Sequence, residues 1–178
     1  MQARCPSDGE SDSLMLHAQR LPGARERQSV ANALHAAEKT CDRRGVQLTP
    51  IRRAVLEALW QVDQPIGAYE LIRKLETRLG RKLAPPTVYR VLDFLLEQKF
   101  IARIETRNAF IPCAHPDHEH TCVFFICEAC GSSAEVENDK VEALFNIDAA
   151  ALGFRIGKRV IEMQGMCANC LTASGAAT

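Results

Sequence analysis

The stretch LAPPTVYRVLDFLLEQKFIARIETRNAFIPC, residues 83–113, predicts a helix followed by two short alternating segments. Pro85 and Pro86 favour an extended lead-in, and Thr87 is placed to cap the helix that we expect to begin there. The buried face of this helix consists of apolar residues at helical spacing, namely Val88, Leu92, Leu95 and Leu96. Alternation of apolar and polar residues on either side of residues 106–108 then predicts a β-hairpin.

Three more helices are predicted upstream, over residues 30–45, 50–59 and 68–80. The second of them begins with a capping hydroxyl, Thr49, and a proline at the first helical position, Pro50. Helices in this order followed by a hairpin indicate a winged helix-turn-helix. The apolar periodicity alone is also compatible with a small helical bundle in which the last helix serves only packing.

The composition is that of a soluble globular protein, with 47% hydrophobic and 25% charged residues. The longest apolar runs are far shorter than the roughly 18 residues that cross a bilayer, and the N-terminus does not resemble a secretory signal. We therefore expect a reducing cytoplasm, where clustered cysteines are metal ligands or redox sensors more often than disulfides. Residues 40–108 carry 13 Lys and Arg against 8 Asp and Glu, whereas residues 109–178 carry 4 against 9. This division favours a polyanion-binding part followed by a cation-binding part.

Four cysteines form two C-x-x-C pairs, Cys127 with Cys130 and Cys167 with Cys170. Such pairs present the four thiolates of a closed, structural zinc site, with two disulfides as the alternative. The 36 residues between the pairs exceed the usual spacing of a compact zinc ribbon, so they must contain secondary structure. We expect a strand, a helix and a second strand there, with zinc joining the C-terminal segment to a strand over residues 123–127.

The segment between the hairpin and the first cysteine pair contains Cys113, His115, His118, His120 and Cys122. His118 and His120 are two residues apart, so their imidazoles face the same way on an extended chain. Glu135 is expected on the antiparallel neighbour of the strand over residues 123–127. A sulfur, nitrogen and oxygen ligand set drawn from both parts of the chain suits a sensor, because metal binding fixes one part against the other.

Three motifs together resemble the ferric uptake regulator family of bacterial metal sensors: LTPIRRAVLEAL at residues 48–59, PPTVYRVLDFLLEQKFIARIE at residues 85–105 and ICEACG at residues 126–131. The run VYRVLDFLLEQ and the cysteine-rich segment are most similar to the zinc uptake regulator branch. The resemblance spans about residues 35–170 and implies an α+β protein. Its parts would be a winged helix-turn-helix domain and a small α/β dimerisation domain with a four-cysteine zinc clip.

With this resemblance, four segments are expected. Residues 1–28 form a flexible tail, residues 29–110 the winged-helix DNA-binding domain, residues 111–172 the metal-binding and dimerisation domain, and residues 173–178 a second flexible tail.

The resemblance places a regulatory zinc site at Cys113, His120 and Glu135. Some family members have a further histidine in the strand after the recognition helix, where this chain has Ala102. We therefore predict His118 as the fourth ligand, with His115 or a water molecule as alternatives. The thiolate favours zinc over iron, which relatives bind with harder ligands.

For DNA, the outward-facing first turn of the recognition helix carries Thr87, Tyr89 and Arg90, and arginine commonly reads guanine in the major groove. The resemblance implies that Tyr69 and Arg90 contact bases. Candidate phosphate contacts are arginines flanking these positions, namely Arg52, Arg53, Arg103 and Arg107.

These features predict a zinc-responsive transcriptional repressor of zinc uptake genes, a homodimer that binds a palindromic operator when its regulatory zinc site is filled. An iron or peroxide sensor of the same family is the nearest alternative, and a structural zinc protein would not explain the extra ligands. We do not expect an enzyme, since the deaminase signature H-x-E with P-C-x-x-C is absent from the sequence.

Overall fold

The computed structural model describes residues 18–20, 27–62, 64–113, 123–136, 139–157 and 159–175. The N-terminal part contains α1 (Arg27–Arg43), α2 (Pro50–Trp60), β2 (Ile66–Gly67), α3 (Ala68–Leu79), α4 (Pro85–Glu97), β3 (Ile101–Ile104) and β4 (Ala109–Pro112). The C-terminal part contains β5 (Val123–Cys127), β6 (Ser133–Val136), α5 (Asp139–Ala151), β7 (Ile161–Gly165) and α6 (Ala168–Ala173), and its sheet is joined by β1 (Ala18–Arg20).

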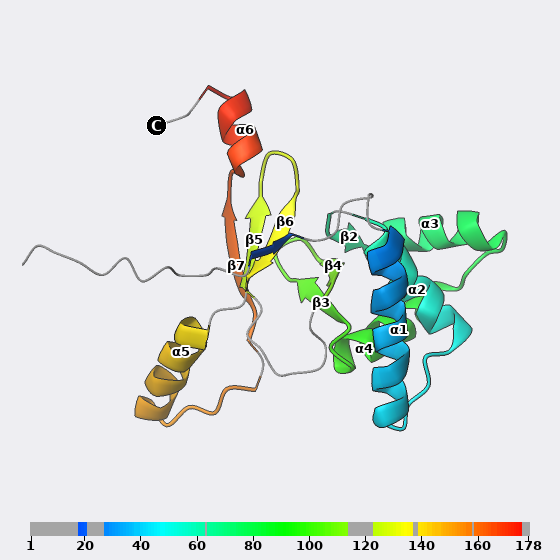
Figure 1. Cartoon of the computed structure of the whole chain (residues 1–178), viewed down its shortest axis with the longest axis horizontal. Coiled ribbons are helices and arrows are strands. Elements are labelled where there is room, and N and C mark those ends of the chain that lie inside the picture. The colour runs from blue at the N-terminus through cyan, green and yellow to red at the C-terminus, as the bar shows by residue number, and fades with distance from the viewer. Residues whose placement is uncertain are drawn as a thin grey trace, which may run out of the picture.

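The N-terminal part is a winged helix-turn-helix, as the sequence predicted. Helices α1 to α4 gather beside a three-stranded antiparallel sheet in the order β2-β4-β3 (Figure 1). The core between them consists of apolar side chains at helical spacing, including Leu56, Leu59, Leu71, Leu75, Leu92, Leu95 and Phe100. Burial of these side chains stabilises the helices against one another.

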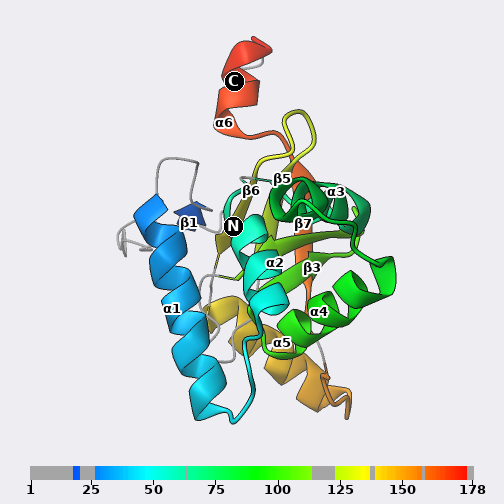
Figure 2. The ribbon, with the colours of Figure 1, turned by 90° about the vertical axis from the view of Figure 1, so that its right-hand side faces the viewer.

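The C-terminal part is a four-stranded sheet in the order β1-β6-β5-β7. Strand β5 pairs antiparallel with β6 and parallel with β7, so β5 and β7 end at the same edge. Helices α5 and α6 lie toward opposite ends of this sheet in both views of the ribbon (Figures 1 and 2). The mixture of helix and sheet confirms the predicted α+β class.

The hairpin β3–β4 packs against β5 through a small apolar cluster of Ile104, Ile111, Phe124 and Ile126, with Ala102 at its margin. Ile104 and Ile111 come from the hairpin, whereas Phe124 and Ile126 come from the C-terminal sheet. The hairpin therefore connects the two parts of the protein.

The structure differs from the sequence-based expectation at the start of α4. This helix begins at Pro85, its N-cap residue is Ala84, and no side chain caps it. Two prolines fit the first helical positions because their φ is preset and their missing N–H would have no partner there. The prediction that Thr87 caps the helix is therefore wrong, since Thr87 lies in the first turn and its N–H donates to the Ala84 carbonyl at 2.9 Å.

A further difference concerns a segment outside the winged helix. Residues 18–20 lie within the segment that we expected to be a flexible tail, yet they pair with β6 as β1. The second strand expected between the cysteine pairs is β7, which starts at Ile161, and Arg159 just before it binds Glu142 of α5 at 2.8 Å. None of the described helices combines the length and the apolar character that a membrane-spanning segment requires.

Candidate metal centres and nucleic-acid interface

The four cysteines of the two C-x-x-C pairs meet at one edge of the C-terminal sheet. Strands β5 and β7 run parallel in a register that pairs Cys127 with Gly165, so Cys167 follows just beyond the end of β7. The four sulfur atoms all lie within 4.8 Å of one another, and Cys130 Sγ is 3.7 Å from Cys167 Sγ. Sulfurs bound to one tetrahedral zinc at about 2.3 Å lie about 3.8 Å apart, so the arrangement fits such an ion.

The electrostatics of this cluster also fit a cation. The pKa of Cys127 is lowered to about 6, first because the backbone N–H of Cys130 donates to its sulfur and then because that of Cys167 does. The pKa of Cys170 is raised to about 12 because its thiol hydrogen-bonds to the neighbouring sulfurs, first that of Cys167 and then that of Cys130. Full ionisation of four adjacent thiols needs a compensating positive charge, which zinc supplies. All four cysteines are free thiols, so the disulfide alternative is not what the structure shows.

A second pair of ligand-type side chains lies where the hairpin meets the C-terminal sheet. Cys113 directly follows β4 and Glu135 lies on β6, and both are buried, with 4% and 3% of their surface exposed. The Cys113 sulfur is 3.7 Å from Glu135 Oε1. Glu135 pairs with Phe124 across antiparallel strands, as the sequence predicted. The structure thus brings together two side chains that are 22 residues apart.

The remaining predicted ligands, His118 and His120, and the alternative His115 lie outside the described residues. Their coordination stays a prediction. Ala102, where some relatives have a histidine, pairs with Ile111 in β3–β4 and packs against the apolar cluster between the two parts. The position therefore belongs to the same junction as Cys113.

Sequence reasoning did not find the contact between β1 and the strand that carries Glu135. In this antiparallel pairing Gln19 lies opposite Glu135. The sequence AQR of β1 is three residues long and shows no apolar alternation, so no local signal marks it as a strand.

Side chains predicted to contact DNA are exposed on neighbouring helices of the N-terminal part. Tyr69, the second residue of α3, is 71% exposed, which is unusual for a tyrosine that serves only packing. Thr87, Tyr89 and Arg90 are exposed in the first turns of α4. Figure 2 looks onto this helical part, with α3 and α4 in view. The arrangement presents two aromatic hydroxyls and a guanidinium to solvent.

The four arginines suggested as phosphate contacts are all engaged within the protein. Arg52 stacks on the Phe94 ring, with Cζ 3.4 Å from the centroid, and Arg53 forms an ion pair with Glu38. The other two are on the hairpin, where Arg103 binds Asn108 Oδ1 at 2.8 Å and Arg107 donates to the Cys127 carbonyl at 3.1 Å.

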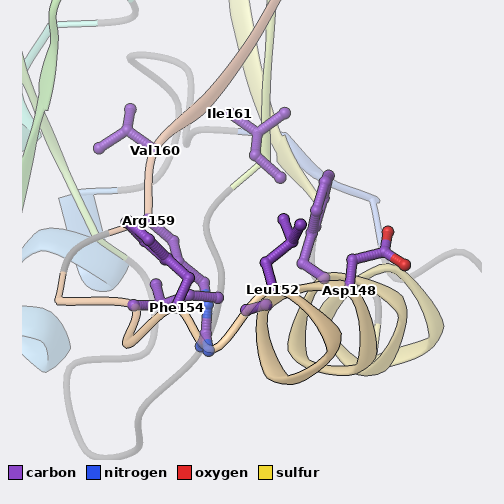
Figure 3. Close-up of a pocket in the computed structure, with 9 residues that line it drawn as sticks. Asp148, Leu152, Phe154, Arg159, Val160 and Ile161 are labelled. Carbon is purple, nitrogen blue, oxygen red and sulfur yellow. The ribbon is translucent and has the colours of Figure 1, made fainter.

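An apolar cavity of about 330 Å³ lies between α5 and the chain that leads into β7 (Figure 3). Its lining is mainly hydrophobic and consists of Phe145, Asp148, Ala149, Leu152, Phe154, Ile156, Arg159, Val160 and Ile161. Leu152 and Phe154, just after α5, are 82% and 67% exposed, and Ile147 within α5 is 66% exposed. Large apolar side chains exposed together are typical of protein interaction surfaces.

Comparison with known proteins places these features in context. The model of the ferric uptake regulator family matches residues 43–164. The zinc uptake regulation protein of Escherichia coli K12 is 40% identical over 147 residues, which cover 82% of this chain and 85% of that protein. A solved zinc uptake regulator in complex with zinc and DNA superimposes with a TM-score of 0.79 at 39% identity, over 83% of this chain and 98% of that one. Holo XcZur superimposes with a TM-score of 0.73, also at 39% identity, over 79% and 98%.

Proposed function

The chain belongs to the ferric uptake regulator family, and from this we propose that it is a zinc-responsive, DNA-binding transcriptional regulator that mainly represses zinc uptake genes. The observation that carries this proposal is the buried meeting of Cys113 and Glu135 at the junction between the winged helix and the C-terminal sheet. A ligand site at that position couples metal binding to the relative orientation of the two parts.

The regulatory site in this proposal consists of Cys113, His118, His120 and Glu135. Zinc bound there supplies a positive charge to a buried thiolate and a buried carboxylate. Sulfur, nitrogen and oxygen donors together suit zinc, whereas sites without sulfur suit harder ions. Cys113 comes from the end of the hairpin and Glu135 from the C-terminal sheet, so their common ligation holds the winged helix in place.

In the same proposal the four-cysteine site holds a structural zinc. Its sulfurs come from the end of β5 and the turn after it, and from the segment that follows β7. Zinc ligation therefore joins the C-terminal segment to the end of β5, an inner strand of the sheet. Structural zinc of this kind contributes directly to folding energy. The proposed boundary between the winged-helix domain and the metal-binding domain, after residue 110, falls within β4, which links the two.

The DNA-contacting surface is proposed to be the exposed side of α3 and α4. Arg90 offers two parallel donors to a guanine, and Tyr69 offers an exposed aromatic hydroxyl. Thr87 and the N-terminal turn of α4 are placed to meet phosphate. Tyr89 completes the set next to Arg90.

The functional form is proposed to be a homodimer acting in the bacterial cytoplasm on a palindromic operator. The apolar cavity between α5 and the chain before β7 supplies a surface that a second copy covers. A two-fold dimer presents two recognition helices, which matches the symmetry of a palindrome. The activity proposed is regulation of transcription and not catalysis.

A gel-shift titration on the promoter of a zinc importer tests the function. The protein is first treated with a chelator that leaves the four-cysteine site loaded, and zinc, iron or manganese is then added in graded amounts. We expect zinc to restore binding at the lowest concentration, and a scrambled operator to remain unbound. Restoration by iron at lower concentration than zinc would assign the chain to iron sensing, and loss of binding only after peroxide treatment would assign it to peroxide sensing.

A further inference from the structure

The turn of the β3–β4 hairpin, residues 105–108, lies against the C-terminal part. The carboxylate of Glu162, on β7, accepts hydrogen bonds from the backbone N–H of Glu105 at 2.5 Å and from that of Thr106 at 3.2 Å. The Thr106 hydroxyl donates a third bond to the same carboxylate at 2.5 Å. Hydrogen bonds to a carboxylate are stronger than those between neutral groups, so the Glu162 side chain holds the turn against β7.

A second set of contacts joins the N-terminal part to the first cysteine pair. Arg107 donates to the Cys127 carbonyl at 3.1 Å, and Gln64 donates to the Cys130 carbonyl at 2.7 Å. Gly131 follows this pair with a φ of +75°, and an added Cβ there would lie 3.1 Å from Gln64 Oε1. The close approach at Gly131 shows that the two parts are packed tightly at this point.

The turn is also fixed within the hairpin. Asn108 adopts a left-handed conformation with φ of +46°, which asparagine tolerates better than most residues, and it accepts a hydrogen bond from Arg103. A winged helix that uses its wing on DNA needs the arginines and backbone N–H groups of the turn to face solvent. In this hairpin Arg107 and two backbone N–H groups bind the C-terminal part instead, and Arg103 binds Asn108 of the turn itself.

From these contacts we propose that the hairpin turn is a joint between the two parts rather than a DNA-contacting wing, and that Glu162 is its positioning residue. The inference rests on the proposed function, because its consequence is the angle at which α4 meets the operator. Strand β3 follows α4 within four residues, so fixing the hairpin fixes the recognition helix.

The joint supplies a second fixed point in addition to the proposed regulatory site. Cys113 lies just after β4, and the turn lies at the opposite end of the same four-residue strands, about 13 Å away at 3.3 Å per residue. The contact at the turn adds to the apolar cluster between the hairpin and β5 and to the contact at Cys113, and it further restricts rotation of the winged helix.

The test uses full-length, zinc-loaded dimer with Glu162→Gln and Thr106→Val, separately and combined. Hydrogen exchange of the peptide that contains residues 104–108 reports on the joint without DNA. Operator affinity, affinity for random DNA, zinc content and dimer mass are measured for each variant. Glu97→Gln, which removes another exposed carboxylate outside the joint, is the matched control.

We expect Glu162→Gln to speed exchange in the turn and to weaken operator binding roughly 5- to 30-fold, with zinc content and dimer mass unchanged. Removing a negative charge alone strengthens binding to phosphate, so net charge cannot explain such a loss. The effects of Glu162→Gln and Thr106→Val should be non-additive, because both act on the hydrogen bond from the Thr106 hydroxyl to Glu162. The conservative Glu162→Asp should recover part of the operator affinity.

Three outcomes would overturn the proposal. If Glu162→Gln leaves hydrogen exchange in the turn unchanged, the contact is not formed in solution, whatever the operator affinity of the variant. Faster exchange with full operator affinity would show that the joint does not position α4. A further variant, Arg107→Ala, tests whether the hairpin contacts phosphate. If it weakens binding to operator and to random DNA equally, and lowers the slope of log affinity against log salt by about 1, the hairpin is a phosphate-contacting wing. Failure of the wild type itself to bind the operator with zinc would instead refute the proposed function.

Discussion

Replacement of Glu135 by glutamine tests the proposed regulatory site through the stability of the protein, first without and then with regulatory zinc. Glu135 is 3% exposed and its Oε1 lies 3.7 Å from the Cys113 sulfur. Glutamine keeps the shape and one oxygen but removes the negative charge. Burying a carboxylate costs several kcal/mol unless a cation or several donors compensate. Glutamine spares this burial cost and keeps an oxygen that can accept the hydrogen bond from the Cys113 thiol, so we expect the form without regulatory zinc to melt close to the wild type.

The zinc-bound form should instead be less stable than the zinc-bound wild type. At free zinc about 1,000 times the dissociation constant, binding stabilises the wild type by about 4.1 kcal/mol. Loss of a ligand weakens metal affinity by at least 10- to 100-fold, which reduces that stabilisation to between about 2.7 and 1.4 kcal/mol. At 2–4 °C per kcal/mol for a chain of this size, the zinc-induced rise in melting temperature should shrink by roughly 3–11 °C.

The assay is calorimetry of the protein with its four-cysteine site loaded, in buffers of fixed free zinc. Glu97→Gln, at an exposed position at the end of α4, serves as the matched control and should respond to zinc as the wild type does. A Glu135→Gln protein that keeps the full zinc-induced shift would refute the assignment of Glu135 as a ligand. A form without regulatory zinc that melts several degrees lower would show that Glu135 stabilises the fold by other contacts.

Three other predictions concern separate parts of the molecule. Cys127→Ser should unfold the C-terminal part or abolish dimerisation, because the four-cysteine zinc contributes folding energy, and a stable zinc-responsive dimer on size exclusion would contradict this. Arg90→Ala should cost about 1–3 kcal/mol of operator discrimination in gel shifts while fold and zinc content persist, whereas equal loss on random DNA would make Arg90 a phosphate contact. The pKa of Glu76 is lowered, first by the Leu83 N–H that donates to it and also by Lys82, so its contribution to stability is present above pH 4.5 and is lost as the pH falls through the lowered value. The melting temperature of Glu76→Gln should accordingly lie below that of the wild type at pH 7 and approach it in acid, and a gap independent of pH would contradict the linkage.

The helices of the winged helix were predictable from sequence because each carries one apolar stripe with a 3.6-residue period. The stripe of α4, for example, includes Val88, Leu92 and Leu95, and all three are buried in the structure. The strand pairing that places Glu135 beside β5 was predictable because a short turn separates the strands and favours an antiparallel neighbour. Thr87 failed as a cap because two prolines already satisfy the first helical positions.

The contacts between the two parts of the protein were not predictable in this way. Glu162 and Thr106 are 56 residues apart, and no periodicity relates them. The arginines of the hairpin, Arg103 and Arg107, look like DNA contacts in a basic sequence, yet Arg103 binds Asn108 within the turn and Arg107 binds the Cys127 carbonyl of the C-terminal part. Charge patterns indicate which partner a segment favours, but they do not say which individual side chain remains exposed.

The surroundings of the proposed regulatory site support the proposal that metal binding there is linked to the orientation of the two parts. Cys113 and Glu135 lie beside a layer of apolar side chains, in which Ile111 comes from the hairpin and Phe124 from the C-terminal sheet. In the structure without a metal the Cys113 thiol donates to Glu135 Oε1 at 3.7 Å. In the proposed site zinc takes the place of this proton, and its attraction to the thiolate and the carboxylate is stronger in such a poorly solvated place than in water. The small side chain of Ala102 at the margin of this layer keeps it apolar, so the charge change falls on the sulfur and the carboxylate rather than on a histidine in the strand.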